Sequence, residues 1–261
     1  MRKNAVKMKL NNGQFAFGTM IKETLNPGVV DVLEIAGFDY FVIDMEHARY
    51  DMETISYILQ YARRSDLTGV VRIPQLNYAN VAKALDMGAE GIWVPHVDTA
   101  DEAGQLVDFG KYPPQGRRGA AVPIFRQQEY QQAASPAAYY QGCNDEVLLI
   151  AQIESARAVE NVAQIAAVDG LDVCMMGTSD LSLDMGYPGQ KNNLEVKKAT
   201  QQVVDSCQKA TIASGNHVGS LDDLRYWMGQ GMQMITYTYD TQLIIDSGKQ
   251  ALEILKKGIQ A

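Results

Sequence analysis

The sequence is poor in the residues that build disulfide frameworks and cysteine metal sites. It contains 3 cysteines in 261 residues, Cys143, Cys174 and Cys207, and no two of them form a C-x-x-C pair. An odd and widely spaced set of cysteines predicts neither a disulfide-stabilised secreted protein nor a thiolate zinc site. We therefore expect a protein of the reducing cytoplasm.

An excess of basic residues and long apolar runs are also lacking. Lys and Arg total 23 against 31 Asp and Glu, a net charge of -8, which argues against nucleic acid or an anionic membrane as the main partner. No stretch approaches membrane-spanning length, and no apolar signal segment follows the charged start of the chain. These absences predict a soluble intracellular protein, in which one or two local arginines could still hold a small anionic substrate.

What the sequence does have is a regular alternation of short apolar segments with segments of helical spacing. Eight such pairs in 261 residues favour a closed (β/α)8 TIM barrel, forming a single domain over residues 1–261. No G-x-G-x-x-G motif follows an apolar segment, which weakens the alternative of an open dinucleotide-binding sheet. A polar, glutamine-rich insertion at about residues 111–142 has the length of a lid, a binding loop or an interface arm. The expected strands are 14–21, 38–43, 69–73, 89–95, 147–154, 171–176, 216–218 and 232–238, and the expected helices are 27–36, 52–64, 79–87, 99–109, 156–166, 194–213, 220–228 and 241–257.

Two charged residues stand where apolar strands are expected. Residues 147–154 are apolar on both faces, as in a strand buried within a parallel sheet, yet they end on Glu154. An ionised carboxylate at the rim of a core costs free energy unless a cation, a metal or hydrogen-bond donors compensate it. Arg72 interrupts the apolar strand 69–73 in the same way. It either neutralises nearby carboxylates or stabilises negative charge that develops on a substrate oxygen.

Glu154 and Asp180 form the predicted metal pair, because they follow two successive strands. Two carboxylates with few histidines and no cysteine make a hard oxygen site, which favours Mg²⁺ or Mn²⁺. The open coordination positions would suit a 2-oxo acid that chelates the ion through its carboxylate and ketone oxygens. The alternative for Asp180 is an N-cap of the following helix, and spacing alone does not decide between the two.

The 3 histidines, His47, His96 and His217, all follow predicted strands, so they belong at the active-site end of a barrel. His47 is the favoured catalytic base, because Asp44 and Glu46 are close to it in the sequence and a carboxylate beside an imidazole raises its basicity. For His96 and His217 the simpler interpretation is a hydrogen-bonded surface residue.

Three further charged residues carry weaker indications. Asp86 stands in the last turn of its expected helix, where the helix dipole disfavours an anion, which indicates a specific partner. That end of the helix points away from the active-site end of a barrel. Arg117 and Arg118, in the insertion, could clamp an acidic substrate tail or a neighbouring chain.

The motifs together resemble those of the HpcH/HpaI aldolases, which are metal-dependent class II pyruvate aldolases. The resemblance runs over nearly the whole chain, and each motif is weak by itself but specific in combination and order. The matching segments are AGFDYFVIDMEH at 36–47, VRIP at 71–74, LDMGA at 85–89, VP at 94–95, YPP at 112–114, GRRG at 116–119, QIE at 152–154, Gly177 with SDLS at 179–182, and DMGY at 184–187.

The resemblance implies roles for individual residues. His47 would be the general base acting through water, Arg72 the transition-state stabiliser, and Glu154 with Asp180 the ligands of Mg²⁺ or Mn²⁺, with Co²⁺ as a further candidate. Asp86 would raise the basicity of the histidine, within the subunit or across a subunit contact. Gln152 and the backbone around Ser179 and Asp180 would hold pyruvate. The resemblance also implies a homohexamer, a trimer of dimers with exchanged C-terminal helices.

The expected reaction is the reversible cleavage of a 4-hydroxy-2-oxo acid to pyruvate and an aldehyde. No lysine stands at a matching strand end, so a Schiff-base mechanism is not expected. The chain departs from the family pattern at 177–180, 120–130 and 216–219, which leaves the aldehyde undetermined. The alternatives are a decarboxylase or acyl-CoA lyase of the same superfamily and a non-catalytic protein that binds a sugar acid.

Overall fold

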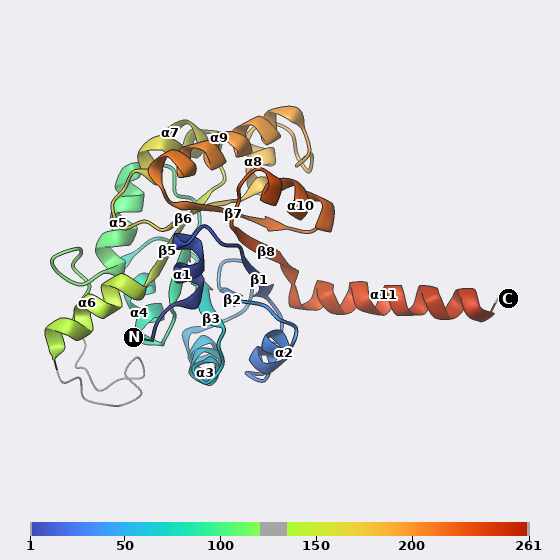
Figure 1. The fold of residues 1–261 in the computed structure, drawn as a ribbon, viewed down its shortest axis with the longest axis horizontal. Helices are drawn as coiled ribbons and strands as arrows, with labels where there is room; N and C mark the ends of the chain where they lie inside the picture. Colours follow the sequence, from blue (N-terminus) through green and yellow to red (C-terminus); the bar gives the residue numbers. More distant parts are fainter. Residues whose placement is uncertain (1, 121–134, 260–261) are drawn as a thin grey trace.

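Eight parallel strands close into a barrel in this computed structural model, which describes residues 2–120 and 135–259. The strands follow one another in chain order, and β8 pairs with β1 to complete the ring. The expected (β/α)8 barrel is therefore confirmed (Figure 1). The strands are β1 (Ala16–Ile21), β2 (Tyr40–Asp44), β3 (Thr68–Arg72), β4 (Gly91–Val94), β5 (Leu148–Ile153), β6 (Val173–Met176), β7 (Ala213–Val218) and β8 (Met234–Tyr239).

The strands are apolar on both faces because each face packs against a separate core. On β2, Tyr40 and Val42 point into the barrel with Trp93 of β4, whereas Phe41 and Ile43 point outward to the helices. This alternation is the period of two that a strand imposes on its side chains. Burial on both sides explains why the strands read as continuous apolar runs and why a charge within one is conspicuous.

Helices surround the barrel, and several begin at capping residues that are visible in the sequence. Asp51, Asn77, Ser155 and Ser220 each accept a hydrogen bond from a backbone N–H of the helix that follows, as N-caps do. The barrel helices are α2 (Val29–Ile35), α3 (Met52–Ala62), α4 (Tyr78–Asp86), α5 (Ala100–Gly110), α7 (Ala156–Ala166), α8 (Thr178–Asp184), α9 (Leu194–Ala210) and α10 (Leu221–Gly229).

A short helix that the sequence pattern did not predict, α1 (Ala5–Asn11), packs against the interior of the barrel. Its Val6 and Leu10 are buried among the inward-facing residues of the strands. Lys7 and Lys9 pair with Asp172 and Asp39, which immediately precede β6 and β2. Because α1 lies at the ends where the strands begin, the opposite ends remain for the active site.

The insertion is only partly visible, since residues 121–134 lie outside the described chain. The end of the insertion and the residues before β5 form the helix α6 (Pro136–Glu146). Arg118 is buried and pairs with Asp86 at 2.6 Å, and Arg117 pairs with Asp108. Both arginines therefore have partners within the chain, which weakens the idea that they clamp a substrate.

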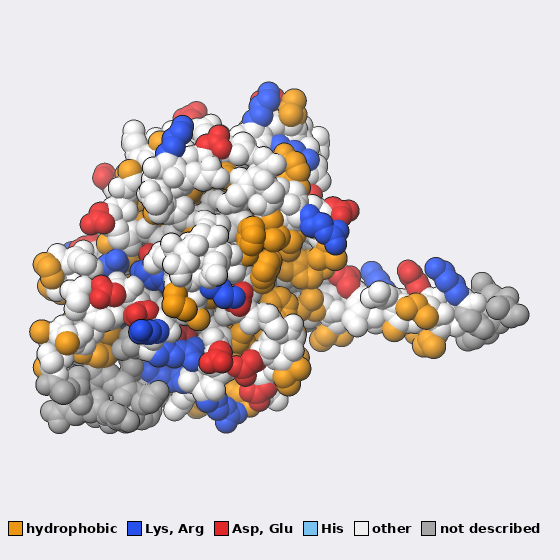
Figure 2. Space-filling view, in the orientation of Figure 1, with side chains coloured by type: hydrophobic (Ala, Val, Ile, Leu, Met, Phe, Trp, Pro, Cys, Tyr) orange, Lys and Arg blue, Asp and Glu red, His pale blue; other side chains and the backbone are white. Residues whose placement is uncertain are grey.

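The last helix, α11 (Asp240–Ile259), extends away from the barrel (Figure 1). Four of its apolar side chains, Ile244, Leu252, Ile254 and Leu255, are more than half exposed. Figure 2 shows hydrophobic atoms along this protruding helix. No helix in the described chain is long and apolar enough to cross a membrane.

Candidate active site

A cavity of about 390 Å³ opens where the barrel strands end. Residues in or just after all eight strands line it, so the closed sheet gathers side chains that are far apart in the sequence. This is the face at which TIM-barrel enzymes carry their active sites. The lining residues are Lys22, His47, Arg72, Trp93, Gln152, Met176, Gly177, Thr178, Ser179, Asp180, Lys191, His217, Gly219, Thr238 and Tyr239.

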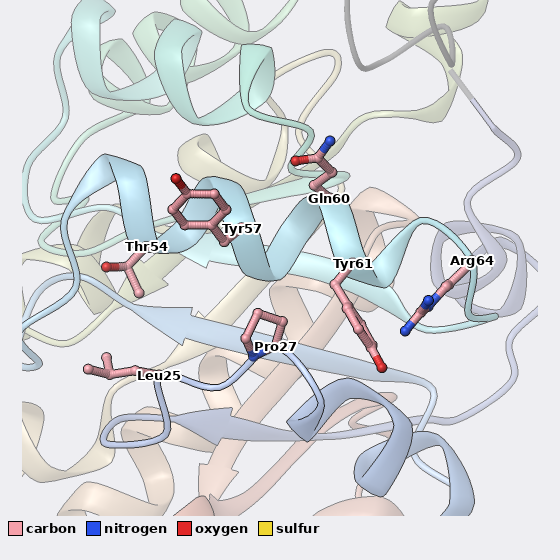
Figure 3. A pocket seen from close by; sticks show the side chains of 7 residues that line it. All are labelled: Leu25, Pro27, Thr54, Tyr57, Gln60, Tyr61 and Arg64. Atoms are coloured by element: carbon pink, nitrogen blue, oxygen red, sulfur yellow. The ribbon is translucent and has the colours of Figure 1, made fainter.

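A second, larger hollow of about 470 Å³ lies between the β1–α2 loop and α3. Figure 3 shows Leu25 and Pro27 facing Tyr57 and Tyr61 across it. It contains no acidic residue and one cation, Arg64, which stacks on the ring of Tyr61 at 3.6 Å from the centroid. By size alone this hollow would be the candidate active site. The cavity at the strand ends is the better candidate, because it is lined by titratable side chains such as His47, Arg72 and Asp180.

Arg72 is held rigidly by carboxylates on the neighbouring strand. It is opposite Asp44 in the β2–β3 register and binds it through two hydrogen bonds, of 2.9 Å from Nε and 2.6 Å from Nη2. Its Nη1 lies 3.0 Å from Oε2 of Glu46. Burial acts to raise the pKa of Asp44, but the hydrogen bonds and charge of Arg72, aided by Lys22, hold it below its ordinary value. Asp44 is therefore ionised and fixes the guanidinium in place.

Glu154 follows β5 and is buried, with 3% of its surface exposed. Its Oε2 accepts a hydrogen bond from Gln152, whose own Oε1 accepts one from Trp93. Its Oε1 lies 2.7 Å from the backbone N–H of His96 and 2.9 Å from the Nδ1 of that residue. Burial, together with the charge of Glu46, raises the pKa of Glu154 against the opposing effect of Gln152 and His96. The carboxyl group expected at this strand end is present and buried, and its ion pair is with His96, which is charged only when protonated.

Gly177 provides the space in which Glu154 sits. A Cβ at this position would lie 2.6 Å from Cβ and 2.7 Å from Oε2 of Glu154, and 3.1 Å from Nε2 of Gln152. The two distances to Glu154 are shorter than van der Waals contacts allow, so a larger residue would displace the Glu154 side chain. Gly177, directly after β6, thus leaves the space that the Glu154 side chain, directly after β5, occupies.

Glu46, His96 and Glu154 are the group within the described residues whose ligand atoms could hold a metal ion, since these atoms lie within 4.8 Å of one another. His96 bridges the two carboxylates, with Nε2 3.4 Å from Oε1 of Glu46. Its backbone has a φ of 55°, a left-handed conformation that costs roughly 1–2 kcal/mol outside glycine. Oε2 of Glu46 is buried without a hydrogen bond of good geometry in the described chain. A divalent cation would offset these two carboxylates, so the residues present fit a metal.

Sequence reasoning had left Glu46 and His96 out of the metal site. Glu46 was considered as a neighbour of His47, and His96 as a surface residue. His96 is indeed 69% exposed at its side chain, but it also contacts both carboxylates. The available signal was their position, because each follows a strand at the same end of the barrel as Glu154.

Among the predicted residues, His47, Arg72, Gln152, Ser179 and Asp180 line the cavity, whereas Glu154 and Asp86 are not among its described lining residues. Ser179 and Asp180 are exposed in the first turn of α8 and line the cavity. Gly177 is the N-cap of α8, so the N-cap alternative for Asp180 is wrong. His47 lines the cavity with its Nε2 3.8 Å from Oε2 of Glu46. Asp86 does not line it and is bound to Arg118.

A barrel with buried carboxylates, an arginine and histidines at its strand ends is typical of an enzyme that acts on a small oxygen-rich substrate. Comparison with known proteins gives the family. Residues 22–247 match the family model described as HpcH/HpaI aldolase/citrate lyase. The chain belongs to this family.

Relatives cover nearly the whole chain. A hydroxypyruvate/pyruvate aldolase from Roseovarius nubinhibens is 31% identical over 251 residues, which cover 95% of each chain. A 2-keto-3-deoxy-L-rhamnonate aldolase from Escherichia coli is 28% identical over 98% of this chain and 94% of its own length. The crystal structure of an HpcH/HpaI aldolase from Desulfitobacterium hafniense matches with a TM-score of 0.90 and 31% identity over 96% of each chain. These relatives support an aldolase and do not favour the decarboxylase, acyl-CoA lyase or binding-protein alternatives.

Replacing Gly177 by alanine tests whether the site depends on the space beside Glu154. We expect Gly177→Ala to weaken Mn²⁺ binding by at least about tenfold, as changes that misorient metal ligands do. Isothermal titration with Mn²⁺ measures this, and the melting temperature reports folding. Gly104→Ala is the control, because a Cβ there meets nothing within 4 Å. Equal Mn²⁺ affinity in Gly177→Ala and wild type would refute this role.

Proposed function

We propose that this enzyme is a divalent-metal-dependent aldolase that reversibly cleaves a 4-hydroxy-2-oxo acid to pyruvate and an aldehyde. The observation that carries the proposal is the buried Glu154, whose carboxylate lies within 4.8 Å of Glu46, the carboxylate that pairs with Arg72 of the cavity lining. The names of the aldolase relatives agree with it.

The metal would be held by Glu154 and Asp180, as the family resemblance implies. Glu46 and His96 are close enough to Glu154 to act as further ligands or to position it. When bound, Mg²⁺, Mn²⁺ or Co²⁺ would polarise the 2-oxo group and favour negative charge on its oxygen. Glu154 is a ligand both in the set that the resemblance implies, with Asp180, and in the set that the geometry offers, with Glu46 and His96. Its replacement is therefore the most informative.

The remaining catalytic roles can be assigned from the positions of the side chains in the cavity. Arg72, fixed by Asp44, would direct its guanidinium toward the 2-oxo oxygen, where negative charge develops as the C3–C4 bond breaks. His47 would remove the proton of the C4 hydroxyl through a water molecule. Gln152 and the backbone at Ser179 and Asp180 would hold the pyruvate half, since all three line the cavity. These roles are proposals that rest on the resemblance and on this placement.

Asp86 requires a second copy of the chain for its proposed effect on His47. It stands at the end of α4 and its partner within the described residues is Arg118. Because it does not line the cavity of its own barrel, an interaction with a histidine would have to cross a subunit contact.

We propose a homo-oligomer, a hexamer built as a trimer of dimers that exchange α11. A helix that extends from the barrel with exposed apolar side chains needs a surface to cover them, and a second copy would provide it (Figure 1). A cytoplasmic location, also proposed, agrees with three free and buried cysteines.

Metal dependence gives the direct test of the proposed reaction. We expect pyruvate to condense with aldehydes in a broad panel, EDTA to stop the reaction, and Mg²⁺, Mn²⁺ or Co²⁺ to restore it. Glu154→Gln should lower kcat/KM by at least about 100-fold, because it removes a ligand charge. Glu195→Gln on the surface of α9 is the control.

Asp180→Asn and Glu46→Gln separate the two ligand sets in the same assay. If Asp180 is a ligand, its variant should need a higher Mn²⁺ concentration for half-maximal activity. Activity that survives complete metal removal, or no reaction with any aldehyde of the panel, would refute the proposed function.

The exchanged helix can be tested by charge. Leu252→Glu with Leu255→Glu should dissociate the oligomer, because each places a carboxylate in an apolar contact. Analytical ultracentrifugation measures the mass of the variant against wild type. Lys249→Glu on the same helix is the control. A wild-type protein that sediments as a monomer contradicts the proposal.

A further inference from the structure

Two lysines in the cavity have no role in the proposed cleavage. Lys22 follows β1, and Lys191 lies in the loop between α8 and α9. Both line the cavity together with His217 of β7. The groups proposed for the pyruvate half are Gln152 on β5 and the backbone at Ser179 and Asp180 in α8. Lys22, directly after β1, lies four strands away from β5 in the barrel order, and Lys191 lies in the segment that follows α8.

The charge of Lys22 is only partly balanced. Its Nζ lies 3.2 Å from Oδ2 of Asp44, and 5.4 Å from the centre of the Tyr239 ring. The same carboxylate oxygen accepts the 2.6 Å hydrogen bond from Nη2 of Arg72. One buried carboxylate thus serves two cations.

Lys191 is exposed and has no ion-pair partner among residues 2–120 and 135–259. It also lines a small adjoining hollow of about 30 Å³, with Asn216 and Asp223. Asp223 is the carboxylate of this hollow, and no ion pair joins it to Lys191. The side-chain oxygen of Asn216 is buried without a hydrogen-bond partner in the described chain. This part of the site therefore holds a cation without an ion-pair partner among the described residues, and the amide oxygen of Asn216 can only accept a hydrogen bond.

The pKa of His217 is affected by burial and by the positive charges of Lys22, Arg72 and Lys191. Burial, followed by the charges of Lys22 and Arg72 and then of Lys191, lowers its pKa to about 4. Its imidazole is therefore neutral near pH 7, with Nε2 3.2 Å from the carbonyl oxygen of Thr238. A neutral imidazole at this position adds no positive charge to the site.

We propose that Lys191 and Lys22 form an anion subsite that selects aldehydes carrying a carboxylate or a phosphate group. This inference rests on the proposed aldol reaction and names the class of its aldehyde. An anionic group beside these lysines would pair with Lys191, which has no ion-pair partner in the described chain, and would gain from the shared charge of Lys22. The residues 177–180 and 216–219, where the sequence departs from the family pattern, contribute to the lining of the cavity and of the adjoining hollow.

Matched pairs of aldehydes test the subsite, with pyruvate as the second substrate. Succinic semialdehyde is compared with pentanal for the carboxylate, and glyceraldehyde 3-phosphate with glyceraldehyde for the phosphate. We expect kcat/KM to be roughly tenfold higher for the charged member of at least one pair, mainly through KM, and the pair that responds identifies the anion. High salt should reduce this preference, because it screens exposed charges.

Lys191→Met should reduce the preference for the charged aldehyde by roughly three- to tenfold. Lys198→Met is the matched control, since Lys198 is exposed on α9 and pairs with Glu195 outside the cavity. Circular dichroism confirms that both variants fold. Equal kcat/KM within both wild-type pairs, or an unchanged preference in Lys191→Met, would overturn the subsite while leaving the aldolase intact. If no aldehyde of either pair reacts, the proposed function itself has failed.

Discussion

Two carboxylates, Glu154 and Glu46, face each other at the ends of the barrel strands, and the site depends on what balances them. Burial and mutual repulsion raise the pKa of Glu154, as expected for like charges in a medium of low polarity. His96 reaches both carboxylates with a left-handed backbone, and Gly177 supplies the space that a side chain would fill. Such an arrangement is unfavourable for stability alone. It becomes reasonable if a divalent cation occupies the site, because the cation converts the repulsion into coordination.

The barrel explains how these groups come together. Parallel strands that close in chain order bring all their carboxyl ends to one face, while α1 fills the other. Register then sets individual contacts, and the pairing of Asp44 with Arg72 is the clearest case. The residues proposed to hold the pyruvate half, such as Gln152, and the cations Lys22 and Lys191 line one cavity. A common chemistry and a variable aldehyde can therefore share one cavity.

Much of this was predictable from the sequence, for physical reasons. Continuous apolar runs that alternate with segments of helical spacing predicted all eight strands of the barrel, and a charge within or at the end of such a run located Arg72 and Glu154. The short helix α1 was not predicted because its apolar residues are few and it is stabilised by packing inside the barrel. The bridging position of His96 depends on a backbone φ that no pattern encodes, and the partner of Asp86 depends on how the insertion folds back. Contacts that depend on tertiary packing or on a second copy of the chain cannot be predicted from the local spacing of residues.

Anomalous diffraction from crystals grown with Mn²⁺ and pyruvate is the most direct test of the metal-centred site. We predict one Mn²⁺ at the strand ends, with a carboxylate oxygen of Glu154 about 2 Å away and pyruvate oxygens among its other ligands. Asp180, Glu46 or His96 would then be identified as the remaining protein ligands. Pyruvate bound in the cavity without a metal, or a metal that does not contact Glu154, would contradict a metal-dependent aldolase centred on this residue.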